Sequence, residues 1–197
     1  MTVSRGLLLV LVDPAPTLDE ELNAWYDTEH LPERAVLPGF VTAMRFTSLG
    51  DGPRYAALYD LTDLGALESD AYLAVSGVNF SPWTRRVTGR AHPVRMTARQ
   101  VAGPGEATGP CTRLLLLKFR QSGDGDASAI AAGLDASFAE YASHLRSRVF
   151  AGVEPGSDFI LSISEFSGAT IPDLAVAAFG ASGARIEMAA AYRPYRG

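Results

Sequence analysis

Two short apolar runs constrain the fold of this chain more than any other feature. They are RGLLLVLV at residues 5–12 and TRLLLLKF at residues 112–119. Each has the length of a β-strand, and an unbroken apolar run of that length is typical of a buried strand. Each is followed by a loop and then by a helical pattern. The chain therefore predicts two copies of one motif.

The helical patterns after the two runs also correspond. The first closes with HLPER at residues 30–34 and the second with HLRSR at residues 144–148. We interpret the shared H-L-x-x-R as the clearest sign of an internal duplication, and we expect both segments to be helix ends. The apolar residues that recur at helical spacing are Leu18, Leu22 and Trp25 in the first pattern, and Ile130, Leu134, Phe138, Tyr141 and Leu145 in the second.

The later segments of the two halves match in the same order. The segment GPGEATGP at residues 103–110 has three glycines and no periodicity, so it predicts a linker. This divides the chain into a first repeat at 1–102, the linker, and a second, degenerate repeat at 111–197. The matching segments are strands at 40–49 and 147–154, strands at 55–61 and 159–166, helices at about 64–75 and 172–182, and strands at 94–98 and 186–190.

Each half therefore has the order β-α-β-β-α-β, which is the ferredoxin-like arrangement. One such half exposes an apolar sheet face, which a protein in water does not leave open. We expect an α+β fold in which the two sheets close on each other, with the helices outside, as a pseudo-two-fold barrel. We expect a small-molecule ligand inside the barrel.

Composition narrows the classes of function. The chain has 197 residues and a net charge of -5, which argues against nucleic acid as a partner. The apolar run near the N-terminus is too short for a signal peptide, and no segment approaches the length of a membrane span. Cys111 is the single cysteine, so no intrachain disulfide forms and a cytoplasmic location is expected.

The first half also resembles a known family. WYDTEHLPER at residues 25–34, followed by LPGF and by a strand with MRF, resembles the EthD-like branch of the dimeric α+β barrel superfamily. The resemblance covers about residues 5–100 and is much weaker over 110–197. It implies the barrel fold. It leaves activity open among cofactor-free monooxygenases, muconolactone-type isomerases, polyketide cyclases, haem proteins and proteins without known activity. Dimers are common in this fold, so a homodimer is a further expectation.

His30 is the first candidate catalytic residue. Its side chain exchanges protons near neutral pH, and the resemblance places it at the mouth of the pocket. Pro32 predicts that the helix ends nearby, and the dipole of a helix C-terminus would favour the charged imidazolium. Asp27 or Glu29 would orient the ring. The structural alternatives are a capping histidine, a surface Asp27, and a Glu29 paired with an arginine.

Further residues are candidates for substrate binding: Tyr26, Tyr59, Trp83, Arg34, Arg86 and His144. Ser81 and Pro82 predict a helix start, from which Trp83 and Phe80 would cover the cavity and Arg86 would meet an acidic group of the substrate. Ordinary packing and solvated arginines are the structural alternatives. Because the second half has fewer polar candidates, we expect the site to be built mainly by the first half.

The three histidines lack the spacing of a metal site, so no metal is expected. The favoured function is a cofactor-independent enzyme, either an acid/base isomerase, cyclase or lyase or an oxygenase, acting on an apolar oxygenated metabolite. The alternatives are a non-catalytic ligand-binding or stress-type protein and a haem protein, for which one histidine would be sufficient.

Overall fold

The computed structural model of the protein describes residues 4–123 and 125–197. Its strands are β1 (Gly6–Val12), β2 (Met44–Ser48), β3 (Tyr55–Leu61), β4 (Val94–Ala102), β5 (Arg113–Arg120), β6 (His144–Gly152), β7 (Phe159–Phe166) and β8 (Ile186–Pro194). Its α-helices are α1 (Asp19–Trp25), α2 (Leu31–Ala35), α3 (Asp70–Leu73), α4 (Pro82–Ala91) and α5 (Asp126–Phe138). Single-turn and 3₁₀ segments are η1 (Pro16–Leu18), η2 (Tyr26–His30), η3 (Leu64–Glu68), η4 (Gly77–Asn79) and η5 (Val176–Arg185).

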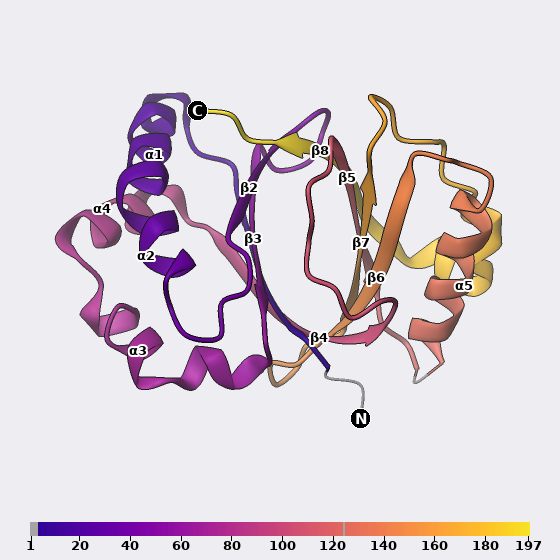
Figure 1. Ribbon diagram of the computed structural model, residues 1–197, viewed down its shortest axis with the longest axis horizontal. Helices are drawn as coiled ribbons and strands as arrows, with labels where there is room; N and C mark the ends of the chain where they lie inside the picture. The colour runs from indigo at the N-terminus through magenta and orange to yellow at the C-terminus, as the bar shows by residue number, and fades with distance from the viewer. Residues whose placement is uncertain (1–3, 124) are drawn as a thin grey trace.

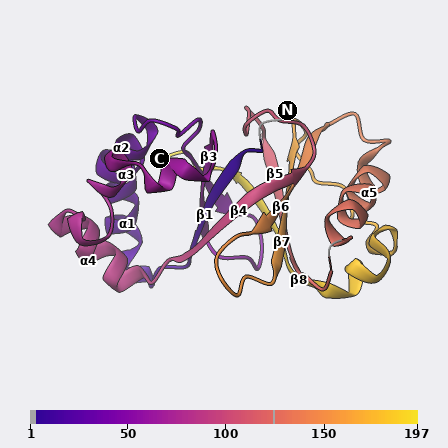
Figure 2. The same ribbon diagram turned by 90° about the horizontal axis from the view of Figure 1, so that it is seen from below.

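The strands form one closed barrel in the order β1-β3-β2-β8-β5-β7-β6-β4. Neighbouring strands are antiparallel, and the halves of the chain join where β2 pairs with β8 and β4 pairs with β6. The helices of the first half cover one side of the barrel and α5 with η5 covers the other (Figures 1 and 2). The α+β barrel with helices outside is confirmed, whereas a duplication as the origin of the two halves stays a prediction.

The interior of the barrel is filled with apolar side chains. Leu9, Phe46, Leu116, Phe150 and Ile163 point inward from different strands and are buried. Side chains alternate along a strand, so the residues between them face outward and pack beneath the helices. The prediction of a ligand inside the barrel is therefore wrong, because apolar side chains from the two sheet faces pack against each other and fill the interior.

A buried charged cluster lies at one end of the barrel. The guanidinium of Arg148 contacts the carboxylates of Asp60 and Glu165, and all three side chains are fully buried. The linker crosses this end, where the backbone N–H groups of Thr108 and Gly109 donate to Asp60 and Glu165 at 2.8 and 3.0 Å. Burial alone would raise the pKa of Asp60, but Arg148 and Thr108 outweigh it and lower that pKa.

Two predicted helical segments are different in the structure. The HLRSR segment is not a helix end, because α5 stops at Phe138 and β6 begins at His144, where it pairs with β7. The match with HLPER is therefore one of sequence and not of structure. The helix expected at 172–182 is the 3₁₀ segment η5, because Gly180 has a left-handed φ of 53° that no continuous α-helix accommodates.

Boundaries elsewhere move by a few residues. The helix expected at about 64–75 is divided into η3 and α3, since Ser69 has an extended backbone and caps α3 through its hydroxyl. The strand expected at 40–49 is regular only over β2. The helix start at Ser81 and Pro82 is confirmed, with the Ser81 hydroxyl accepting from Thr84 N–H. In the described ranges, no helix has the length and apolar character needed to cross a membrane.

We predict that Arg148→Met destabilises the protein. Removing one partner of a buried ion pair typically costs about 3–5 kcal/mol, because the remaining charges stay buried without compensation. The free energy of unfolding, measured with urea, should fall by that amount relative to the wild type. The exposed Arg99→Met is the control and should change it by less than about 0.5 kcal/mol.

The pH dependence of the same variant has a defined sign. Without Arg148, the pKa of the buried carboxylates in the folded state rises above that in the unfolded state. The deficit in stability should then be largest at neutral pH and shrink as the pH falls toward about 4. A deficit that is independent of pH would contradict the ion-pair explanation.

Candidate functional site

The segment YDTEH forms a wide turn inside a continuous helix. Residues Tyr26–His30 have π-helical geometry between α1 and α2, and Leu31 N–H donates to the Tyr26 carbonyl five residues earlier. The helix therefore does not end at Pro32, as the sequence predicted, but continues to Ala35. In an α-helix Pro32 would clash with the carbonyl four residues back, and the wider turn relieves that clash. Turns of this kind are frequent at functional sites.

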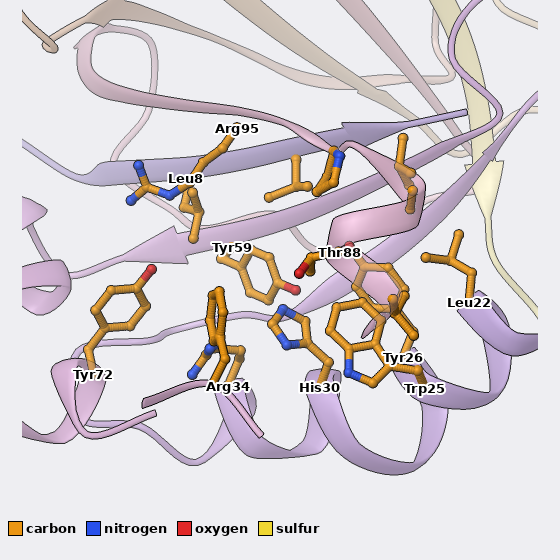
Figure 3. Close-up of a pocket in the computed structure, with 16 residues that line it drawn as sticks. Leu8, Leu22, Trp25, Tyr26, His30, Arg34, Tyr59, Tyr72, Thr88 and Arg95 are labelled. Atoms are coloured by element: carbon orange, nitrogen blue, oxygen red, sulfur yellow. The ribbon is translucent and has the colours of Figure 1, made fainter. Parts of the chain in front are cut away.

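A cavity lies between this helix, α4 and the outer face of the first-half strands (Figure 3). Its volume is about 100 Å³. Figure 3 shows Tyr72 and Arg95 at one end and Leu22 at the other, with His30, Tyr59 and Thr88 between them. The lining side chains come from residues 8–95, so the first half alone builds this cavity. The aromatic side chains that line it are Trp25, Tyr26, Tyr59, Tyr72 and Phe80.

His30 faces this cavity from the last position of the wide turn. Its ring stacks on Trp25 with centroids 4.2 Å apart and meets the edge of Tyr26 at 5.4 Å. Its Nδ1 atom is buried and has no hydrogen-bond partner among the described residues. Burial lowers the pKa of His30 to about 3, and the positive charges of Arg34 and Arg45 contribute to the same shift. The helix dipole does not favour a charged His30 as the sequence suggested, because this residue lies within the helix and not at its C-terminus.

Tyr59 and Arg34 bring two further polar groups to the cavity. The buried hydroxyl of Tyr59 has no partner among the residues the structure describes, and burial raises its pKa well above 10. In Figure 3 this hydroxyl points toward His30. Arg34 is buried and lies 5.2 Å above the ring of Tyr72. One guanidinium nitrogen donates to the Val75 carbonyl, while Nη1 lies 3.3 Å from Glu33 without a well-aligned hydrogen bond.

The two carboxylates expected to orient His30 lie elsewhere. Glu29 accepts hydrogen bonds from Ser81 at 2.6 Å and Thr84 at 2.9 Å, so it joins this helix to the start of α4. Asp27 forms an ion pair with Arg45 at 2.9 Å, on the other side of the helix. Adjacent helical residues such as Glu29 and His30 do not face each other. Asp27 and His30 are three positions apart and would be neighbours in a regular α-helix, but they lie in the wider π-helical turn, and Asp27 contacts Arg45 instead. The geometry therefore does not support the prediction that Asp27 or Glu29 orients the His30 ring.

The other predicted binding residues divide into two groups. Tyr26 lines the cavity, and burial raises its pKa to about 12. Trp83 and Arg86 do not line it. Arg86 forms an ion pair with Glu21, and the Trp83 ring packs against the buried apolar cluster of the first half. His144 lies in the second half, on β6, where its ring bonds Ser147.

Sequence reasoning missed Leu8, Tyr72, Thr88 and Arg95 as lining residues. Leu8 follows from the alternation of β1 once the inward face is known. Tyr72 and Thr88 carry no comparable signal, because the position of α3 and α4 over the sheet depends on tertiary packing.

The arrangement is suited to binding an oxygen atom of an aromatic compound. The aromatic walls contact a flat apolar ring, and Arg34 and Tyr59 supply donors for a carbonyl or phenolate oxygen. A neutral histidine beside that oxygen is able to accept a proton. No group of three or more metal-binding side chains occurs among residues 4–123 and 125–197.

The comparisons with known proteins agree with the fold. No protein-family model matches the sequence, and no curated protein does. An anthrone oxidase-like protein superposes with a TM-score of 0.70 at 16% identity, over 98% of this chain and 92% of that chain. A protein described as a monooxygenase from Lactobacillus acidophilus reaches 0.60 at 10% identity, over 98% and 94%. A chlorite dismutase mutant from Candidatus Nitrospira defluvii reaches 0.60 at 8% identity, over 98% and 92%.

The chain has the fold of the dimeric α+β barrel superfamily. All the strands of the closed barrel described above belong to this one chain. The resemblance of the sequence to this superfamily is confirmed for the fold. At these identities the comparisons show the fold and do not show the chemistry of the cavity.

We predict that His30 stays neutral over the physiological range. Its ring signals in NMR spectra should not titrate between about pH 5 and 8, because charging it would bury a cation beside Arg34. Since the unfolded state has a pKa near 6.5, stability should be lost as the pH falls from about 6.5 toward about 3. His30→Gln assigns the signal, and a midpoint near 6.5 would refute the burial argument.

We also predict that Tyr59→Phe stabilises the protein. A buried hydroxyl without a partner costs about 1–3 kcal/mol, so its removal should raise the free energy of unfolding by about 1 kcal/mol. The matched control is Tyr192→Phe, whose hydroxyl donates to the Pro53 carbonyl at 3.1 Å and whose loss should lower stability. Equal effects of the two substitutions in urea unfolding would show that Tyr59 has a partner in solution.

Proposed function

We propose that the protein is an enzyme that removes a proton from a small aromatic, oxygenated compound bound beneath the wide turn. One observation carries the proposal. His30, with its pKa lowered by burial, lines an aromatic cavity together with Tyr59 and Arg34. His30 Nδ1 and the Tyr59 hydroxyl have no hydrogen-bond partner among the described residues, and Arg34 Nη1 has only the ion pair with Glu33 at 3.3 Å. Native proteins leave few such atoms unpaired, and those that remain are often the ones a ligand completes.

The roles follow from charge. Arg34 and Tyr59 would bind the oxygen of an enolisable ketone or a phenol, and His30 would accept the proton. A pKa of about 3 makes His30 a weak base in the free protein. As negative charge develops on the substrate oxygen, the imidazolium gains an opposite charge beside it, which raises its pKa during the reaction. The donors on the oxygen stabilise the same charge.

The anion so formed has several fates. It can isomerise or cyclise, or it can react with molecular oxygen. The names of two structural neighbours, an anthrone oxidase-like protein and a protein described as a monooxygenase, support the last. For anthrone, loss of the proton opposite the carbonyl gives a carbanion that dioxygen oxidises. The balanced reaction is anthrone plus O₂ to anthraquinone plus water.

Substrate binding must widen the cavity. Its volume of about 100 Å³ is below the roughly 300–1,000 Å³ usual for small-molecule sites. Phe80 lines the cavity, is not fully buried and lies in the segment before α4, so movement of that segment would admit a larger ring. A compound with one ring needs the least movement, since a cavity of about 150 Å³ accepts benzene.

The residues present do not fit a haem. The cavity beside His30 has a volume of about 100 Å³, and a haem macrocycle would need far more widening than a compound with one ring. The corresponding space of the second half is filled by Ile130, Leu134, Phe138 and Phe179. Binding without turnover is the remaining alternative, and the experiments below distinguish it.

We predict that His30→Ala lowers the rate of anthrone oxidation by about 10² to 10⁴, the usual contribution of a placed acid or base. Oxygen uptake and the absorbance of anthraquinone report the reaction. The control, His144→Ala, removes the histidine of the second half and should leave the rate within about threefold of wild type. A loss below about tenfold in folded His30→Ala, or equal losses in both variants, would refute the assignment.

Binding is measured separately from turnover. Trp83→Phe leaves Trp25 as the sole tryptophan, so its fluorescence reports ligands in the cavity. Quenching by anthrone or by 1-naphthol without any turnover would favour the non-catalytic ligand-binding protein. Membership of the EthD-like branch, a homodimer and a cytoplasmic location stay predictions.

A further inference from the structure

A second hollow lies on the outer surface of the barrel, away from the candidate active site. It covers β2, β8 and β5, at the end where β8 leaves the barrel, and has a volume of about 770 Å³. Figure 1 shows the last segment of the chain running from β8 toward α1 along this edge. Arg113, Arg193 and Arg196 line it together with Thr47, Tyr55 and Tyr195. We call this hollow the arginine groove.

The three arginines of the groove lack carboxylate partners. None of them forms an ion pair with a residue that the structure describes, and no Asp or Glu lines the groove. Two carboxylates accept hydrogen bonds from the lining tyrosines, Asp19 from Tyr55 and Asp27 from Tyr195. Both already pair with other arginines, Asp19 with Arg54 at 3.1 Å and Asp27 with Arg45 at 2.9 Å. In a chain with net charge -5, three unpaired guanidiniums in one hollow form a local positive field.

Strand register brings two of these charges together. Arg193 pairs with Thr47 across β2 and β8. On its other side, Leu114 pairs with Tyr192, so continuing the same register sets Arg113 opposite Arg193. Like charges directly opposite each other on a sheet are destabilising. An anion between them would turn that repulsion into attraction.

We propose that the arginine groove binds a small multivalent anion that carries phosphate or carboxylate groups. Guanidinium groups bind both groups through paired hydrogen bonds. The volume is that of a small-molecule site, and the partly exposed Tyr195 contributes aromatic surface to an organic part of the ligand. This proposal does not rest on the function proposed for the cavity, because the stack of Tyr26, Arg45 and Tyr195 separates the two.

The test is isothermal titration calorimetry of the full chain with pyrophosphate and with citrate. We expect at least one of them to bind with a Kd below about 1 mM. Arg193→Met and Arg113→Met should each weaken that binding about tenfold, since each removes one charged donor. A rise in ionic strength from about 0.05 to 0.5 M should weaken it further. The stronger of the two probes distinguishes a phosphate ligand from a carboxylate ligand.

Arg99→Met is the matched control, because Arg99 is exposed on β4 outside the groove. It should leave binding unchanged. Circular dichroism establishes that each variant is folded, and chemical shifts of Tyr195 and Thr47 should move on titration. No binding of either probe, or an equal loss in Arg99→Met and Arg193→Met, would overturn the proposal.

Discussion

The structure depends on the closure of the barrel by two strand pairings between the halves of the chain. The pairs β2 with β8 and β4 with β6 remove the open edges that each four-stranded sheet would otherwise have. Closure also buries the apolar face of each sheet against the other, which is the main source of stabilisation. The linker forms hydrogen bonds to Asp60 and Glu165 of the buried Arg148 cluster, so it is held across one end of the barrel.

Closure determines where a ligand can bind. Once the interior is packed, the remaining space lies between the sheets and their helices. In the second half that space is filled by phenylalanine, leucine and isoleucine side chains. In the first half the wide turn places Trp25, Tyr26 and His30 over the sheet, and a cavity remains among them. The asymmetry of the two halves therefore follows from side-chain volume and from one helical irregularity.

Unpaired polar groups mark the two places that we interpret as functional. In the cavity, the groups are shielded from water, so each unmade hydrogen bond is costly. In the arginine groove, the guanidinium groups are in contact with water. They repel one another, and salt weakens that repulsion. Elsewhere on the described surface most arginines have acidic partners, as the pairs of Arg86 and Arg90 with Glu21 show.

Periodicity in the sequence was sufficient for the strands, because an apolar run such as residues 5–12 or 112–119 has few alternatives in water. The α+β barrel and the helix start at Ser81 were also predictable from the sequence. The prediction that the helix ends near Pro32 was wrong, because the wider turn before this proline allows the helix to continue. The prediction for HLRSR was also wrong, because its strand pairing with β7 overrides helical propensity.

Tertiary structure alone decided the chemistry of the site. The sequence placed Asp27, Glu29 and His30 together, but the helix directs the two carboxylates to Arg45 and to α4, away from the ring. Tyr59 lies near His30 only because β3 and the helix pack against each other, whereas Arg34 is four residues beyond His30 on the same helix. The charge of His30 likewise depends on burial and on nearby cations, which no residue spacing encodes. Packing between segments that are distant in the sequence buries the polar residues of this helix and removes water from them. That burial is why the helix is a candidate active site.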